Sequence, residues 1–121
     1  MVWNYRQSTG ELKHDNVSFA FGYSGFGADK NKPESQGHKG SGPIPRGRWL
    51  IGPVRDSKNT GPYSIVLNPA PGTDTLGRGD FRIHGDSIAA PGSASHGCII
   101  MPRVIRQAIM ASKDYELEVI E

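Results

Sequence analysis

Glycine and proline constrain this chain more than any other feature, with 16 glycines and 9 prolines among 121 residues. Glycine adopts turn conformations that other residues avoid, and proline lacks the amide hydrogen that a central strand needs. So many turn-forming residues in a short chain favour short strands joined by tight connections over a helical bundle. The length suits one domain, residues 1–121, with a single hydrophobic core. We therefore expect a mainly β fold in one domain.

Strands are predicted where short apolar or alternating runs lie between turn-forming residues. The predicted strands cover residues 2–6, 11–14, 17–21, 48–51, 63–67, 81–84 and 115–119. Four prolines are expected between strands, where a missing amide donor does least harm: Pro53, Pro62, Pro69 and Pro71.

Two further segments are predicted. Residues 22–42 are rich in Gly, Ser, Asn and Lys and nearly lack apolar periodicity, which indicates a long surface loop with a functional role or partial disorder. Pro102 suits the first turn of a helix that runs to about Ser112, with Val104, Ile105, Ala108 and Ile109 on one face. This is the one helix that the sequence clearly predicts.

Charge and hydropathy exclude several classes of function. The net charge is +2, and no run of Lys or Arg is present that would follow a phosphate backbone, so a nucleic-acid partner is not expected. The first residues, from Met1 to Arg6, lack the basic and apolar regions of a secretory signal. No window reaches membrane-spanning length, so membrane insertion is not expected.

The only cysteine, Cys98, cannot form an internal disulfide, so it is either a small buried residue or a reactive one. A free thiol is only slightly ionised at neutral pH, and a nucleophilic cysteine needs a neighbouring base or positive field. His84, at the end of a predicted strand, and His96 are close in sequence. Gly97 permits a tight turn, which would leave the amides of Gly97 and Cys98 free to stabilise an oxyanion. These neighbours favour a catalytic Cys98.

Other interpretations of these residues were weighed. A zinc site could use His84, His96 and Cys98, but the spacing is unusual and a fourth ligand would have to come from His14 or His38. We therefore expect no metal and no cofactor. Asp86 is interpreted as a turn or capping carboxylate and not as a catalytic group.

The string Ser95-His96-Gly97-Cys98, preceded by Ile83-His84-Gly85, resembles the signature of the L,D-transpeptidase catalytic domain. Four segments together, residues 22–25, 42–47, 81–87 and 97–100, resemble more closely the transpeptidase-related effectors of type VI secretion systems. The resemblance spans most of the chain. It implies a β-sandwich or partly closed barrel with one short helix after the catalytic cysteine.

The resemblance also implies roles for individual residues. Cys98 would be the nucleophile, His84 the base that takes its proton, and His96 a second active-site histidine. Gly97, Ser95 and Gly85 would contribute to oxyanion or substrate binding, with Ser95 packing or bonding within its loop.

The chain departs from the family pattern in two places. Ten residues separate His84 from Ser95, fewer than in ordinary cell-wall transpeptidases, which implies a trimmed lid over the site. Ile100 occupies a position where those enzymes often have Arg or Asn, so no substrate contact is carried over to this position. Arg103 is a candidate replacement, but a solvated arginine at the helix start is the preferred interpretation.

The implied function is a cysteine-dependent enzyme acting on peptidoglycan tetrapeptide stems. A short lid admits water and small acceptors more readily than a second stem, which favours L,D-carboxypeptidase activity and D-amino acid exchange over cross-linking. The alternatives are another Cys-His peptidase or amidase of the cell wall, and a non-catalytic wall-binding module with a buried Cys98. An activated Cys98 is expected to alkylate well below the pH range of a free thiol.

The expected setting is antibacterial. Peptidoglycan stems lie outside the cytoplasmic membrane, so a chain without a signal peptide would reach them as a toxin secreted into the periplasm of a target bacterium. A periplasmic immunity protein is the second expected partner.

Overall fold

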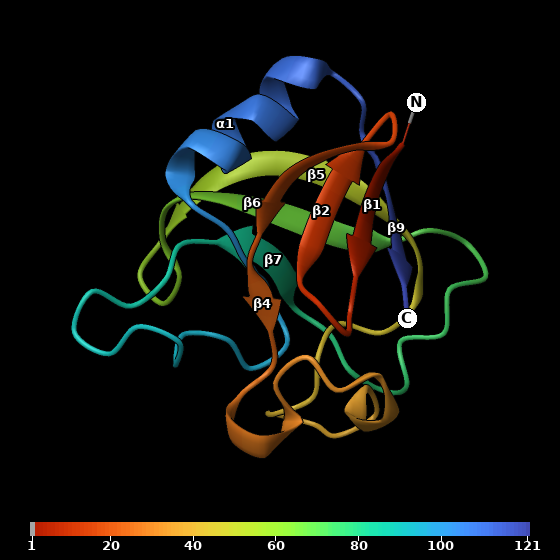
Figure 1. Ribbon diagram of the computed structural model, residues 1–121, viewed down its shortest axis with the longest axis vertical. Helices are drawn as coiled ribbons and strands as arrows, with labels where there is room; N and C mark the ends of the chain where they lie inside the picture. The colour runs from red at the N-terminus through yellow and green to blue at the C-terminus, as the bar shows by residue number, and fades with distance from the viewer. Residues whose placement is uncertain (1) are drawn as a thin grey trace.

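The computed structural model describes residues 2–121, which form a mainly β fold with a nearly closed, barrel-like sheet (Figure 1). The strands are β1 (Trp3–Arg6), β2 (Glu11–His14), β3 (Val17–Phe21), β4 (Tyr23–Ser24), β5 (Gly47–Ser57), β6 (Gly61–Pro69), β7 (Phe81–His84), β8 (Ile99–Ile100) and β9 (Glu116–Ile120). Helix α1 (Arg103–Ser112) follows Cys98, and 3₁₀ turns form at Gly27–Asp29 and Pro33–Ser35. The predicted fold class is confirmed.

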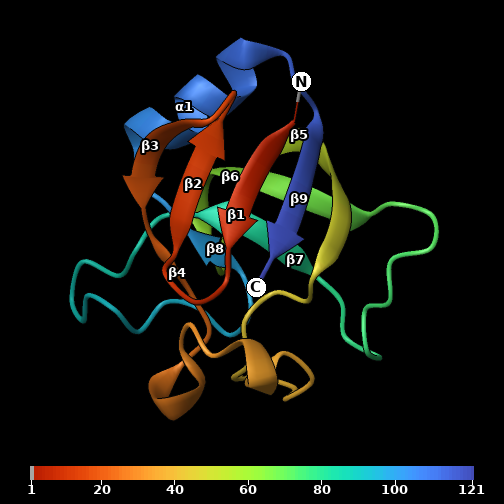
Figure 2. The ribbon, with the colours of Figure 1, turned by 45° about the vertical axis from the view of Figure 1, so that its right-hand side comes forward.

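The sheet has the strand order β3-β2-β1-β9-β5-β6-β7-β8-β4. Its two end strands, β3 and β4, are joined by Gly22 alone, so the sheet must curl until its ends approach (Figure 2). A Cβ atom at Gly22 would lie 1.8 Å from the carbonyl oxygen of Ile100, so only glycine allows this approach. The connection through Gly22 therefore brings the two ends of the sheet together beside β8.

The strand β9 joins the two halves of the sheet. It pairs parallel with β1 and antiparallel with β5. Leu117 and Val119 are buried between the exposed Glu118 and the half-buried Glu116, so the predicted alternation is confirmed. Tyr115 precedes the strand and is half exposed. The apolar core lies inside the curved sheet and includes Trp3, Tyr5, Leu12, Ile44, Trp49, Ile65, Phe81, Ile83, Ile99 and Ile109.

The prediction that four prolines lie between strands is wrong for three of them. Pro53 lies within β5, Pro62 is the second residue of β6 and Pro69 is the last residue of β6. The β5–β6 pairing shifts register between Ile51 and Val54, so Pro53 occupies a bulge where the ladder requires no amide donor. The long β5–β6 hairpin was therefore predicted as two shorter strands.

The segment 22–42 is a loop for most of its length, but it is less superficial than its composition predicts. Ser24 in β4 and Ser35 in the second 3₁₀ turn are both buried. The Ser24 hydroxyl donates to the carbonyl of Gly97 (2.9 Å) and accepts from the amide of Ile44 (2.9 Å). A small polar side chain with both of its hydrogen-bonding functions satisfied can be buried without penalty.

Helix α1 begins after Pro102, which is the N-cap residue and not part of the first turn. Ile109 is buried, whereas Val104, predicted on the same face, is exposed. Arg106 replaces it on the inner face, where its side chain donates to the carbonyls of Met101, Pro62 and Tyr63. The helix is thereby attached to β6. None of the helices within residues 2–121 has the length and apolar character that membrane crossing requires.

The substitution Ser24→Ala should lower the free energy of unfolding by about 2 kcal/mol, because each buried group left unsatisfied costs roughly 1–3 kcal/mol. Ser18→Ala on the exposed face of β3 is the matched control and should be nearly neutral. Urea unfolding of the three proteins measures both effects. Equal stability of Ser24→Ala and Ser18→Ala would show that the Ser24 hydroxyl contributes nothing.

Candidate active site

Two adjacent strands bring His84 and Cys98 to one place. His84 ends β7, and Cys98 immediately precedes β8, which runs parallel to β7 with Ile83 opposite Ile99. Both side chains line a cleft of about 450 Å³, whose other lining residues include Arg78, Phe81, His96 and Gly97. His84 and Cys98, which the loop between β7 and β8 separates in the sequence, therefore line the same cleft.

The imidazole of His84 is held in a defined orientation. Its Nδ1 lies 2.9 Å from the carbonyl oxygen of Gly85, and because a carbonyl only accepts, Nδ1 carries the hydrogen. The lone pair of Nε2 is then free to take a proton. Burial lowers the pKa of His84 below its usual value, and the charges of Arg106 and Arg82 lower it further. His84 is therefore neutral at neutral pH.

Cys98 is half buried, and its thiol points toward the carbonyl oxygen of Asp80, with Sγ to O at 3.8 Å. Burial raises the pKa of Cys98 to about 11, although a hydrogen bond from the backbone amide of Arg82 and the charges of Arg82 and Arg78 lower it. The resting thiol is thus protonated. The expectation that Cys98 alkylates well below the range of a free thiol is not supported, because burial outweighs the positive charges around it.

Two buried serine hydroxyls organise the residues 95–98, which we call the Cys98 turn. The Ser95 hydroxyl donates to the carbonyl of Cys98 and accepts from the amides of Gly25 (2.9 Å) and Gly97 (3.1 Å). Ser24 holds the Gly97 carbonyl. Ser95 is fully buried, and its hydroxyl bonds both within its own loop and to Gly25 of the segment 22–42.

The amide of Gly97 is not free, so the expectation of two available oxyanion donors is corrected to one. Its N–H is occupied by Ser95 because the tight turn directs it inward. Within residues 2–121, the N–H of Cys98 has no hydrogen-bond acceptor. Of the two amides expected to stabilise an oxyanion, that of Cys98 therefore remains available.

His96 lines the rim of the cleft and does not bond to Cys98. Its Nδ1 lies 2.8 Å from the carbonyl oxygen of Gly40, and its ring stacks on Phe26 with centroids 5.1 Å apart. Gly85, expected to bind substrate, provides the carbonyl that orients His84. It also lines a hollow beside this cleft. Lys39 and Gly40 of the loop 22–42 line the cleft beside His96.

A second hollow of about 760 Å³ adjoins the first. The two share Asn59, Thr60, His84, Ala94 and His96. The second is lined also by Lys58 from the β5–β6 hairpin and by the loop that follows β7, including the fully exposed Ile88. His84 and His96 therefore lie where the two hollows meet.

The remaining residues singled out in the sequence lie outside the reacting groups. Asp86 accepts hydrogen bonds from the hydroxyl of Tyr23 and the amides of Ser87 and Gly92, which confirms it as a carboxylate that closes its loop. Ile100 is buried and lines neither hollow. Arg103 lies over the ring of Tyr63 and lines neither hollow.

The alternative zinc site is not assembled. His14 pairs with Asp114 and stacks on Trp3, and His38 pairs with Asp29, so neither joins Cys98. In the part of the chain that the structure describes, no group of three or more His, Cys, Asp or Glu side chains could hold a metal ion.

One residue of the cleft was missed by the sequence reasoning. Arg78 lies beside the Cys98 turn, and its guanidinium contacts the ring of Phe81 (5.2 Å from the ring centroid). It belongs to the turn before β7, and an isolated arginine among glycines gives no pattern that separates it from a solvated side chain. Its hydrogen-bond acceptors are backbone carbonyls, which every residue type has, so the sequence does not reveal them.

Comparison with known proteins agrees with this architecture. No curated protein sequence matches the chain. The family model described as the Tlde1 domain matches residues 19–119, from within β3 to within β9. This range includes every residue of the cleft described above. The chain therefore belongs to the Tlde1 domain family, the L,D-transpeptidase-related effectors of type VI secretion systems.

Proposed function

We propose that this protein is a cysteine-dependent peptidoglycan-modifying enzyme, an L,D-carboxypeptidase that also exchanges D-amino acids on tetrapeptide stems. One observation supports it above the others. His84 and Cys98 line the same cleft, and the bond from Nδ1 of His84 to Gly85 leaves Nε2 as a free base. Family membership supports the substrate class.

The proposed reaction starts from two neutral groups. As Cys98 attacks the carbonyl of the L,D-amide, its thiol proton passes to Nε2 of His84, and the amide of Cys98 stabilises the oxyanion. The tetrahedral intermediate collapses when the imidazolium returns the proton to the departing amine of D-alanine. This breaks the C–N bond and leaves a thioester on Cys98.

Resolution of the thioester determines the product. Water, deprotonated by His84, gives a tripeptide stem and the free thiol, which is carboxypeptidase activity. The amine of a free D-amino acid gives an exchanged stem. The space for these small acceptors is the second hollow, which adjoins the cleft at His84 and His96. His96 is proposed to orient groups at this junction.

Turnover of purified muropeptides should be abolished by Cys98→Ala and reduced to a small residual rate by His84→Ala. Cys98→Ala loses the nucleophile, and His84→Ala loses a general base worth about 10²–10⁴-fold in rate. Mass spectrometry of the products should show tripeptide stems with the wild type and with Arg103→Met, whose side chain lies outside the cleft. Cleaved glycan, cleavage at another amide, or substrate left intact by folded wild type would contradict the proposal.

The pH dependence of kcat/KM should reflect His84 and not free thiolate. Neutral His84 is the active form and its pKa is lowered, so the rate should fall only below about pH 6.5, the usual histidine value. Above that value it should be flat, because the thiol gives its proton directly to His84. Residual activity of His84→Ala should instead rise with pH toward the pKa of Cys98 at about 11. The same rise in the wild type would remove His84 from the base role.

We further propose that the enzyme acts in the periplasm of a target bacterium, where an immunity protein protects the producer's siblings. Membership of a type VI effector family supports delivery into target cells. The two open hollows at His84 offer a surface that such a partner could fill.

Expression in a bacterium tests this delivery proposal. Wild type fused to an export signal should cause swelling or lysis, because its substrate lies outside the cytoplasmic membrane. Exported Cys98→Ala and unexported wild type should be nearly harmless, as measured by culture density and microscopy. Equal toxicity of the unexported form, or no toxicity from folded exported enzyme, would contradict periplasmic action.

A further inference from the structure

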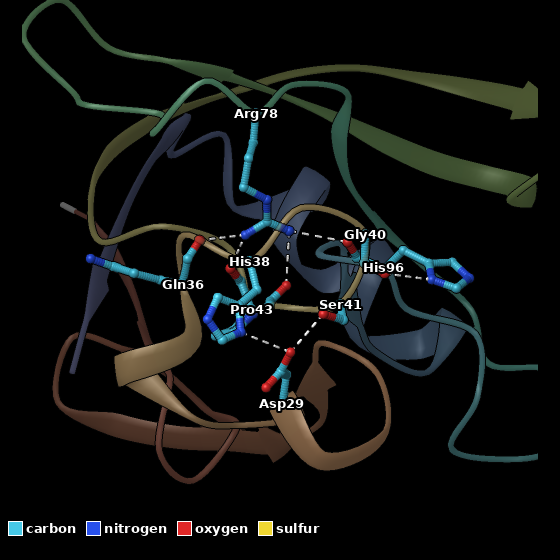
Figure 3. Close-up of polar contacts among 9 residues, drawn as sticks. Asp29, Gln36, His38, Gly40, Ser41, Pro43, Arg78 and His96 are labelled. Atoms are coloured by element: carbon cyan, nitrogen blue, oxygen red, sulfur yellow. Dashed lines mark hydrogen bonds and ion pairs between the residues drawn. The ribbon is translucent and has the colours of Figure 1, made fainter.

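The guanidinium of Arg78 is surrounded by backbone carbonyls from two separate parts of the chain. Nη1 donates to Gln36 (2.6 Å) and Pro43 (2.8 Å), and Nη2 donates to Gly42 (2.9 Å) and His96 (3.1 Å). Figure 3 shows the side chain reaching down from its own loop into this ring of oxygens. A single side chain thereby ties the residues 36–43 to the Cys98 turn.

The positive charge of Arg78 is not neutralised by a carboxylate. Among residues 2–121, it forms no ion pair, whereas other arginines of the chain do, such as Arg46 with Glu121 and Arg48 with Glu116. Four neutral carbonyls satisfy its hydrogen bonds without cancelling its charge. A half-buried cation without an acidic partner is costly to retain, which points to a use for the charge itself.

The guanidinium of Arg78 lies against Gly97, the residue before Cys98. A Cβ atom at Gly97 would lie 2.5 Å from Nη2 of Arg78, so the glycine makes room for the guanidinium. The ring of Phe81 supports it from another side, and both Arg78 and Cys98 line the same cleft. Water is displaced from this cleft when substrate binds, and the field of a fixed charge then acts more strongly.

We propose that Arg78 is a positioning residue that provides the positive field in which the Cys98 thiolate forms and fixes the Cys98 turn against residues 36–43. This inference rests on the proposed function, since it assigns a cation to the same nucleophile. The attraction between Arg78 and ionised Cys98 lowers the pKa of the thiol, against the dominant effect of burial.

Other charges face the thiol and must be separated from Arg78. Arg82 lowers the pKa of Cys98 through its charge and its amide, and Asp80 raises it. Lys39 lines the same cleft. The variants therefore change Arg78 alone: Arg78→Lys keeps the charge but cannot span four carbonyls, and Arg78→Gln and Arg78→Met remove it. Arg103→Met, a cation removed outside the cleft, is the matched control.

The readout is the rate of alkylation of Cys98, the single cysteine, by iodoacetamide between pH 6 and pH 11. A thiol whose pKa rises by one unit loses about tenfold of its thiolate at a fixed pH below the pKa. The charge of Arg78 is the smallest of the named effects on this thiol, so Arg78→Gln and Arg78→Met should react about two- to threefold more slowly than the wild type at pH 8. Arg78→Lys should react at a rate closer to the wild type than either neutral variant does, and Arg103→Met should match the wild type.

Hydrogen exchange distinguishes the effect of the Arg78 charge from the effect of its hydrogen bonds to the backbone. Hydrogen exchange in residues 36–43 should become faster in all three Arg78 variants, because each loses carbonyl contacts. A folded neutral variant whose alkylation profile is unchanged or shifted to lower pH would overturn the proposal, since Arg78 would then act only as a structural tie.

A measurement on the wild type covers the case in which neither neutral variant folds, as judged by near-ultraviolet circular dichroism. A positive field beside the thiolate should favour iodoacetate over iodoacetamide relative to a free cysteine peptide. If the ratio of the iodoacetate rate to the iodoacetamide rate is the same for the protein and for the peptide, the proposal is overturned. Alkylation requires no peptidoglycan, so inactivity of the wild type on muropeptides would count against the proposed function alone.

Discussion

Two buried serine hydroxyls hold the geometry on which the rest of the site depends. Ser95 binds three backbone groups of residues 25, 97 and 98, and Ser24 binds the remaining carbonyl of residue 97 together with the amide of Ile44. The turn has no regular secondary structure of its own, so these side chains replace the ladder that a strand would provide. The thiol, its amide and the cleft wall all take their positions from this network.

Above that network, burial sets the protonation of the reacting pair. It raises the pKa of Cys98 and lowers that of His84, so both groups are uncharged before substrate arrives. A neutral thiol is a poor target for oxidants and electrophiles, which react with thiolate. Under the proposed function, the nucleophile is therefore generated during the reaction and is not present as a resting thiolate.

Much of this could be predicted from local patterns. The turn at residues 8–10 located a strand at 2–6, alternation located one at 115–119, and these correspond to β1 and β9; Pro102 marked the start of α1. Cys98 and His84 were identifiable because their residue types carry the chemistry. The full length of β5 could not be predicted, because Pro53 interrupts the apolar pattern of the strand. In the structure a bulge at Pro53 lets the strand continue. Arg78 could not be predicted either, because its acceptors are carbonyls 18 to 42 residues away, and any residue type can supply a carbonyl.

The place of β9 in the sheet affects how the protein is made. Of the nine strands it is synthesised last, yet it lies between β1 and β5 and is the only strand that connects the N-terminal hairpins to the rest of the sheet on that side. Until it has left the ribosome, the strand that carries Ser24 and the strands that flank Cys98 belong to an unfinished sheet. A nascent or truncated chain therefore contains Cys98 and His84 without the cleft that brings them together, and the cell that synthesises the protein meets an assembled site only after translation of β9 is complete.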